Sequence, residues 1–257
     1  MASASVRKIS IMLAVLHYID TNGISLGHRL QVQQHHRAVQ TPYQHLKMNN
    51  EFQQLLRVRQ DIAVSELIFY MMHLSDNVAT YALGEWVGLD YLNWYLRLVG
   101  LMQAKHRYLT PPMEATEDTV FTAKEVQSLL QFVVQEDTEK LYVSAPLLKF
   151  GKTVLQQHQS KKLSRYVNQV SYQKGGSLPR GITDAMAVWD PSQERHVYMV
   201  VFIDDLPVDS GHVSLKTNLK LLQRKLEVWG YNLVQQVAGR HVPRIPISDR
   251  VRGVASG

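Results

Sequence analysis

Residues 5–19 of the chain read SVRKISIMLAVLHYI, and this stretch decides the fold. Its apolar residues recur at steps of three and four positions, the spacing of a buried amphipathic helix; they are Ile9, Met12, Leu13, Leu16 and Ile19. The pair Asn22-Gly23 is expected to end this helix. At its start, Ser5 and Lys8 are three positions apart, so both side chains are predicted to lie on one face.

Ser5 and Lys8 are a candidate pair of nucleophile and base. A serine hydroxyl reacts poorly at neutral pH unless a base lies within hydrogen-bonding distance. Lys8 would lie at the positive end of the helix dipole and among apolar residues, and both effects lower the pKa of a lysine. Backbone N–H groups near Ser5 could also stabilise an oxyanion. The alternative interpretation is an N-cap serine followed by a solvated surface lysine.

Two polar triplets follow in the chain. Ser75-Asp76-Asn77 comes after the strongly apolar stretch 65–74, which predicts a core helix, and before a second predicted helix at 78–87. A polar turn between helices is the ordinary alternative. Lys174-Gly175-Gly176 is expected at the end of a strand at 169–173, where an edge strand can pair with an extended substrate. Its alternative is a Gly-Gly hairpin turn with a surface lysine.

Taken in order, the three motifs resemble the S-x-x-K, S-D-N and K-T-G signature of the class A serine β-lactamases and penicillin-binding proteins. The resemblance extends over residues 9–19, 23–26, 75–101 and 181–189. It implies an acyl-enzyme on Ser5, formed with a β-lactam or a D-Ala-D-Ala peptide. Lys8 and Ser75 would move protons. Asn77 and the triplet Lys174, Gly175 and Gly176 would bind the substrate, and Asp76 would be structural.

The resemblance also implies an α/β fold, with a helical subdomain and a short antiparallel sheet covered by helices. We expect one domain at 1–238, with its helical part at about 20–165 and its sheet part at about 1–19 and 166–238. A basic, flexible tail would follow at 239–257. Family members place a helix and two strands before the nucleophile, so the N-terminal strands are expected to be missing here, and we suspect a fragment or a late start.

Other elements are predicted from local patterns. Asp90 is a candidate N-cap for a helix at 90–99, and Thr122 with Glu125 forms a capping box. Further helices are expected within 145–157 and along 215–233, where leucines recur on one face. Strands are expected at 184–189 and 196–203, on either side of an Asp190-Pro191-Ser192 turn.

Two departures from the family pattern bear on activity. Gly175 occupies the position where the family has Ser or Thr, which removes one hydrogen bond to the substrate carboxylate; Ser177 or Arg180 could compensate. The family resolves its acyl-enzyme with a glutamate in a Glu-x-x-Leu-Asn context, and no such motif lies between Leu101 and Thr122. Only Glu114 and Glu117 are positional candidates, so deacylation is expected to be slow.

Composition excludes several classes of function. The chain has no cysteine, which excludes disulfides, thiolate nucleophiles and cysteine-bound zinc. Its formal charge of +6 is scattered, which argues against nucleic acid and suits small anionic substrates. We expect no cofactor and no metal, and interpret His35-His36 as part of a polar loop. No apolar run approaches the ~20 residues of a membrane span.

Neither a signal peptide nor the oligomeric state can be read from the chain, and an extracytoplasmic location is expected from the resemblance alone. Three hypotheses remain. The favoured one is a serine acyl-transfer enzyme, either a β-lactamase or a D,D-peptidase. The second is a catalytically impaired relative that acts as a binding module. The third, a nucleic-acid binder, depends on charge alone.

Overall fold

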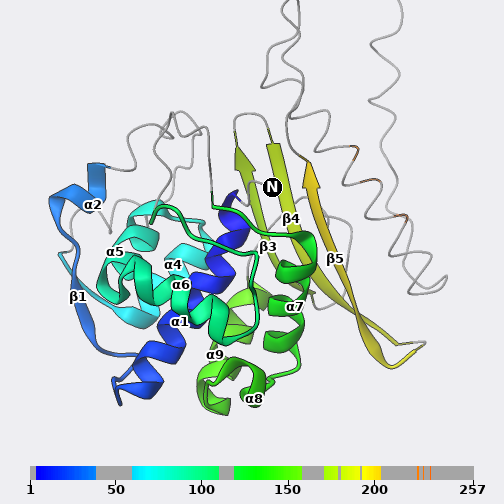
Figure 1. Ribbon diagram of the computed structural model, residues 1–257, viewed down its shortest axis with the longest axis horizontal. Helices are drawn as coiled ribbons and strands as arrows, with labels where there is room; N and C mark the ends of the chain where they lie inside the picture. The colour runs from blue at the N-terminus through cyan, green and yellow to red at the C-terminus, as the bar shows by residue number, and fades with distance from the viewer. Residues whose placement is uncertain are drawn as a thin grey trace, which may run out of the picture.

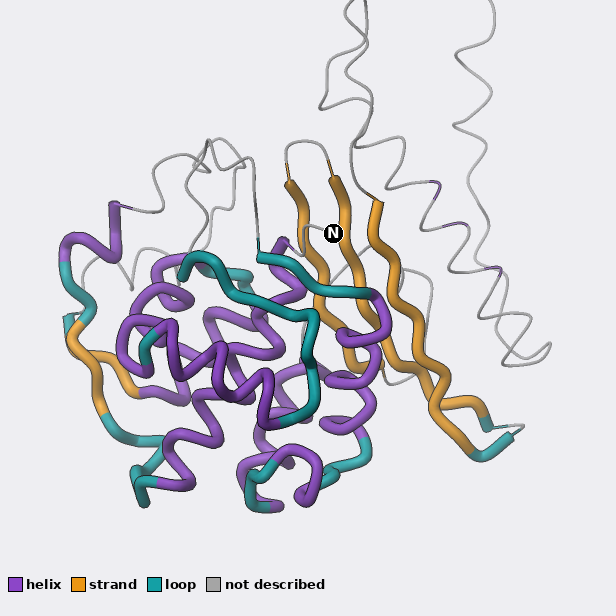
Figure 2. Tube along the Cα trace, in the orientation of Figure 1, coloured by secondary structure: helices purple, strands orange, loops and turns teal. Residues whose placement is uncertain are grey.

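The computed structural model describes residues 4–38, 60–109, 119–157, 171–178, 181–191 and 193–203, together with residues 225, 228 and 232. Helices gather on one side of this part of the molecule and a three-stranded sheet lies on the other (Figure 2). The α/β fold predicted from the sequence is confirmed.

The elements follow one another as a helical half and then a sheet. In chain order they are η1 (Ala4–Arg7), α1 (Lys8–Thr21), β1 (Arg29–Gln31), α2 (Gln34–Ala38), β2 (Asp61–Ala63), α4 (Val64–His73), α5 (Asn77–Val87), α6 (Leu89–Leu98), α7 (Ala123–Val134), α8 (Thr138–Leu141), α9 (Ala145–Gln157), β3 (Ser171–Leu178), β4 (Gly181–Asp190) and β5 (Arg195–Ile203).

Helix α1 is the centre of the core. It runs through the middle of the helical half and contacts α4, α5, α6 and α9 (Figure 1). The predicted helix at 5–19 is confirmed, but its first turn is the 3₁₀ helix η1 and it is not amphipathic. Every residue from 8 to 17 is buried, because helices surround α1 and leave it no solvent-facing side. Gly23, with φ +62°, follows the helix end as the Asn-Gly pair predicted.

The three-stranded sheet has the order β3-β4-β5, with both pairs antiparallel. Helix α9 packs against β3, and α7 packs against β4 and β5. Lys174 pairs with Ala185 and Gly176 with Thr183, so the triplet lies inside β3 and not at its end. The Gly-Gly hairpin interpretation is therefore wrong. Strand β3 continues to Leu178, and β4 begins at Gly181.

Several predictions from local sequence patterns can be compared directly with the structure. The Thr122–Glu125 capping box and the helix at 145–157 are confirmed. Asp90 is not an N-cap, because the N-cap of α6 is Gly88, at φ +87° and two residues earlier, and the helix begins at Leu89. A short β1–β2 pair, with Arg29 opposite Ala63, was not predicted.

The remaining predictions fall mostly outside the described residues. These are the helix at 215–233, the tail at 239–257, the candidates Glu114 and Glu117, the side chains of Ser177 and Arg180, and the domain limits, which stay predictions. Within the described part of the chain, no helix is long and apolar enough to cross a membrane.

Candidate active site

Ser75 lies in the short link between α4 and α5, as the sequence predicted. Asp76 caps α5, because its Oδ1 accepts a hydrogen bond of 2.8 Å from the backbone N–H of Ala79. Ser75 itself has φ +56°, in the left-handed region that non-glycine residues rarely adopt. This backbone turn directs both the carbonyl and the hydroxyl of Ser75 toward Lys8.

Lys8 is fully enclosed, with 1% of its surface exposed. Its Nζ donates to the carbonyl O of Ser75 at 2.7 Å and to Oδ1 of Asn77 at 2.9 Å, and lies 3.3 Å from Ser75 Oγ. The interpretation as a solvated surface lysine is wrong. Ser5 is not the N-cap either, because Arg7 is the residue that precedes α1.

Lys174 reaches the same hydroxyl from the sheet. It is completely buried on β3, and its Nζ lies 3.0 Å from Ser75 Oγ and 3.2 Å from the carbonyl O of Gly175. Two buried amines, from α1 and β3, therefore meet at one serine oxygen. Like charges this close in a desolvated setting disfavour double protonation.

The pKa of Lys8 is lowered well below the usual range of a lysine. Burial is the main cause, followed by the charge of Lys174 and then that of Arg7, while Asp76 acts in the opposite direction. A neutral Lys8 fits its contacts. Two of its N–H groups donate to the carbonyl O of Ser75 and to Oδ1 of Asn77, and both of these oxygens can only accept. The lone pair of the amine is then left to accept a hydrogen bond from the Ser75 hydroxyl. The geometry thus allows Lys174 to donate to Ser75, and Ser75 to donate to Lys8.

Ser5 is half-buried on η1, and β3 lies directly against it. A Cβ atom added to Gly176 would overlap the backbone N of Ser5 and come within 2.8 Å of Ala4 Cβ and of Thr183 Oγ1. Only glycine allows this approach of the strand to the serine. Among the described residues, Ser5 Oγ makes no hydrogen bond, and the contacts of Lys8 go to Ser75 and Asn77.

The structure therefore brings the sequence-predicted residues into one region, through two different links. Lys8, Lys174 and Asn77 converge at Ser75, while Ser5 meets Gly176 through its backbone. Asp76 lies beneath them as the cap of α5.

Sequence reasoning missed a second polar layer behind Lys8. Ser10 Oγ donates to the carbonyl O of Arg7 at 2.7 Å, so His106 Nε2, 2.9 Å from the same oxygen, is the donor in that contact. His106 Nδ1 is buried with no hydrogen-bond partner among the described residues. Burial, helped by the charge of Arg7, lowers the pKa of His106 to about 3. Ser10 and His106 are far apart in sequence, and no local pattern links them.

The interpretation of His35-His36 as a polar loop is wrong, because both residues lie on α2. The Nε2 atoms of His35 and His36 lie 3.0 Å and 2.6 Å from the carboxylate of Glu85 on α5. The three sets of ligand atoms are within 4.8 Å of one another, close enough to hold a metal ion. However, His36 Nδ1 accepts a hydrogen bond from the N–H of Gln33, which assigns the proton of neutral His36 to Nε2. The hydrogen bonds of His35 and His36 to Glu85 therefore account for this cluster, and they connect α2 to α5.

Two buried lysines contact one loop serine at the place where the helical half meets the antiparallel sheet. This arrangement is expected of a serine acyl-transfer site. A family model described as "Beta-lactamase enzyme family" matches residues 1–223. The chain belongs to this family.

Solved structures show the same fold. A β-lactamase from Sphaerobacter thermophilus is 20% identical and has a TM-score of 0.72, with 92% of this chain and 83% of that chain covered. A class A β-lactamase from Bacteroides cellulosilyticus is 23% identical with a TM-score of 0.66, covering 90% and 83%. The TLA-3 extended-spectrum β-lactamase is 16% identical with a TM-score of 0.75, covering 93% and 86%. No curated protein sequence matches the chain.

Proposed function

We propose that this protein is a serine acyl-transfer enzyme that forms an acyl-enzyme on Ser5 with β-lactams or D-Ala-D-Ala peptides. The observation that carries the proposal is the meeting of Lys8 and Lys174 at the hydroxyl of Ser75, beside the contact between Ser5 and Gly176. No other region of the described chain combines a desolvated amine, a proton-relaying hydroxyl and a serine at a helix start.

Acylation would use these groups in sequence. Ser5 Oγ attacks the carbonyl carbon while its proton passes to neutral Lys8, directly or through Ser75. The carbon–nitrogen bond then breaks, and Ser75 delivers a proton to the leaving nitrogen and regains one from Lys8. Lys174 donates to Ser75 Oγ, which holds that hydroxyl in place, and its charge attracts the carboxylate of the substrate.

Substrate binding would involve β3 and Asn77. The triplet Lys174, Gly175 and Gly176 lies within the outer strand of the sheet order, where an extended substrate can align with the backbone. Asn77 uses Oδ1 to accept from Lys8, which leaves its Nδ2 amide group to contact a substrate carbonyl.

We further propose that the acyl-enzyme is long-lived, because no Glu-x-x-Leu-Asn motif lies between Leu101 and Thr122 and Glu114 and Glu117 are candidates by position alone. This favours a D,D-peptidase or penicillin-binding activity over rapid β-lactam hydrolysis. Members of the family act outside the cytoplasm, and we extend that location to this protein as a proposal.

The test is incubation of the full chain with a fluorescent penicillin, followed over time by intact mass and by β-lactam hydrolysis. A stable adduct that is lost in Ser5→Ala supports a penicillin-binding activity, and turnover supports a β-lactamase. Ser25→Ala is the matched control, since it removes a hydroxyl from the loop after α1, where Ser25 bonds Gly27. An adduct that persists in Ser5→Ala would refute the assignment of the nucleophile.

The second candidate is a catalytically impaired relative that binds such ligands without reacting. Gly175 favours it, because the middle of the β3 triplet has no hydroxyl for a substrate carboxylate. The same experiment separates the two, since this candidate predicts penicillin binding in calorimetry with no mass change in a folded sample.

A further inference from the structure

Arg7 is a buried charged residue within the Ser5–Lys8 turn, defined here as residues 5–8, and none of the proposed catalytic roles uses it. It is the last residue of η1 and the immediate neighbour of Lys8, and only 3% of its surface is exposed. Arginine is rarely buried to this extent unless its guanidinium is held by specific partners.

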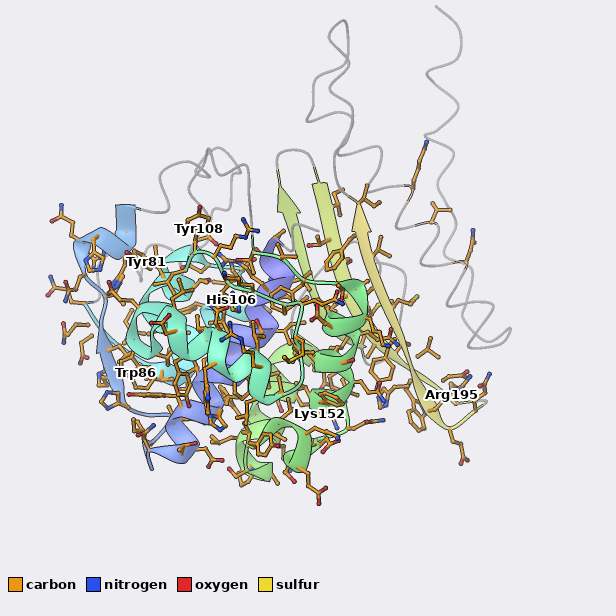
Figure 3. All side chains as sticks on the ribbon, viewed as in Figure 1. Tyr81, Trp86, His106, Tyr108, Lys152 and Arg195 are labelled. Carbon is orange, nitrogen blue, oxygen red and sulfur yellow. The ribbon has the colours of Figure 1, made fainter. Side chains whose placement is uncertain are left out.

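The partners of Arg7 lie at two distant points of the chain. Its Nη1 donates to the carbonyl O of Tyr108 at 2.8 Å and to Oγ1 of Thr119 at 3.2 Å, and its Nη2 donates to the carbonyl O of Leu109 at 2.9 Å. Tyr108, on the segment that crosses the helical half, is labelled in Figure 3. One guanidinium therefore joins residues 108–109 and residue 119 to the Ser5–Lys8 turn.

These two chain segments are also held together without Arg7. Lys105 and Val120 form an antiparallel bridge with N···O distances of 3.0 and 3.1 Å. The buried carboxylate of Glu125 accepts from the backbone N of Ala104 at 2.8 Å and of Thr122 at 2.9 Å. We call residues 103–109 and 119–122 the stem. Because the bridge and Glu125 already close the stem, the distinct effect of Arg7 is to attach it to the Ser5–Lys8 turn.

The attachment also fixes a positive charge next to Lys8. Lys174 from β3 and Arg7 from η1 both lower the pKa of Lys8, after burial, and Asp76 at the start of α5 raises it. On the stem side, the group that faces Arg7 is His106, whose pKa the same charge helps to lower. A flexible surface arginine would be screened and would have little such effect.

We propose that Arg7 is a positioning residue of the reaction: the stem holds the guanidinium of the residue that precedes Lys8 in a fixed place, and this buried cation helps to keep the Lys8 amine neutral and able to accept a proton. The inference rests on the proposed function only in that Lys8 acts there as the base.

The first test is the pH dependence of adduct formation in the wild-type chain, Arg7→Met and Arg7→Lys. In Arg7→Met the loss of the cation moves the acid limb of the profile to higher pH, because the pKa of Lys8 rises. Arg7→Lys keeps a basic side chain but loses the forked contacts of the guanidinium with the stem, so we expect it to restore the wild-type limb only in part. Arg97→Met, which removes an exposed arginine of α6, is the control and leaves the limb in place. A purely structural Arg7 would lower the rate at every pH without moving the limb, and that result overturns the proposal.

The second test does not depend on activity. The ¹³Cε resonance of Lys8, assigned by its loss in Lys8→Met, is titrated in the wild-type chain and in Arg7→Met. We expect the midpoint to rise in the variant, and an unchanged midpoint overturns the inference. Arg7→Gln, which keeps a hydrogen-bonding side chain toward the stem, replaces Arg7→Met if that variant does not fold. Absence of any adduct on wild-type Ser5 would instead count against the proposed function.

Discussion

Lys8 and Lys174 approach a single oxygen atom from opposite halves of the molecule, at 3.3 and 3.0 Å from Ser75 Oγ. The helical half contributes one amine and the sheet the other, so the site exists only when the two halves are packed together. Because both amines are desolvated, the charge of each depends on the other. Substitutions at the site are therefore expected to affect activity and the pH dependence of stability together.

Lys8→Met should remove the base and lower the rate of penicillin acylation by about 100-fold or more. Methionine fills a similar volume without a charge, so the variant is expected to remain folded. Stopped-flow measurement of adduct formation, with circular dichroism as the check on folding, tests this. A rate within threefold of wild type would show that Lys8 is not the base.

The lowered pKa of Lys8 also predicts how stability depends on pH. Between the folded-state pKa and the ordinary value of 10.5, the unfolded chain binds more protons than the folded one. The contribution of Lys8 is therefore fully present above that ordinary value and is lost as pH falls through the folded-state pKa. Denaturant unfolding should show a free energy that rises toward alkaline pH, by up to about 1.4 kcal/mol per pH unit. Lys8→Met should flatten this rise, and equal slopes in the two proteins would contradict the prediction.

His106 should make the protein sensitive to acid. Its folded-state pKa of about 3 lies below its ordinary value of 6.5, so its contribution to stability is complete above pH 6.5 and is lost as pH falls toward 3. The accumulated loss at pH 3 is roughly 5 kcal/mol. In His106→Gln, which can still donate to Ser10, much of this dependence should vanish in acid-unfolding curves. His28→Gln provides a control on an exposed histidine.

Gly176→Ala should separate β3 from the nucleophile. The new Cβ would overlap the backbone N of Ser5, and backbone atoms cannot move aside as a side-chain end can. We expect acylation to fall at least tenfold, since misplacement of reacting groups by a fraction of an ångström to 1 Å is costly. Gly151→Ala is the matched control, because its Cβ would meet the flexible ends of Leu16 and Met12 at 3.1 and 3.3 Å. Equal acylation rates in both variants would show that the close approach of β3 is unimportant.

Gly175→Thr should improve the reaction by supplying the hydroxyl that the family places in this triplet. A hydrogen bond to a charged group contributes about 1.5–3 kcal/mol, which corresponds to roughly 10- to 100-fold in the apparent affinity for a β-lactam carboxylate. Gly175→Ala adds a Cβ without a hydroxyl and serves as the comparison. If threonine and alanine give the same acylation kinetics, the missing hydroxyl is not what limits binding.

The elements with strong local patterns could be predicted from the sequence. Helix α1 follows from its three- and four-residue apolar steps, and α7 from its capping box. The position of Lys174 within β3 could not be predicted, because Gly175 and Gly176 are typical of turns. Their place inside a strand is decided by pairing with β4 and by the contact with η1, neither of which is visible in the local sequence.

The candidate site, too, could be predicted only in part from the sequence. The three motifs and their order predicted which residues would lie close together, because both can be seen in the sequence alone. The role of Arg7 could not be predicted, since its partners are 101 to 112 residues away. Glu85 was missed for the same reason, because it reaches His35 and His36 across 50 and 49 residues.

The left-handed backbone of Ser75 creates a conflict between thermal stability and catalytic activity. Glycine adopts φ +56° without steric cost, so Ser75→Gly would relax the link between α4 and α5 while deleting the oxygen that both amines share. A laboratory selection for thermotolerance alone would weigh this relief of the backbone against the hydrogen-bond partner that the two buried amines lose. A selection that also demands chemistry would retain the hydroxyl.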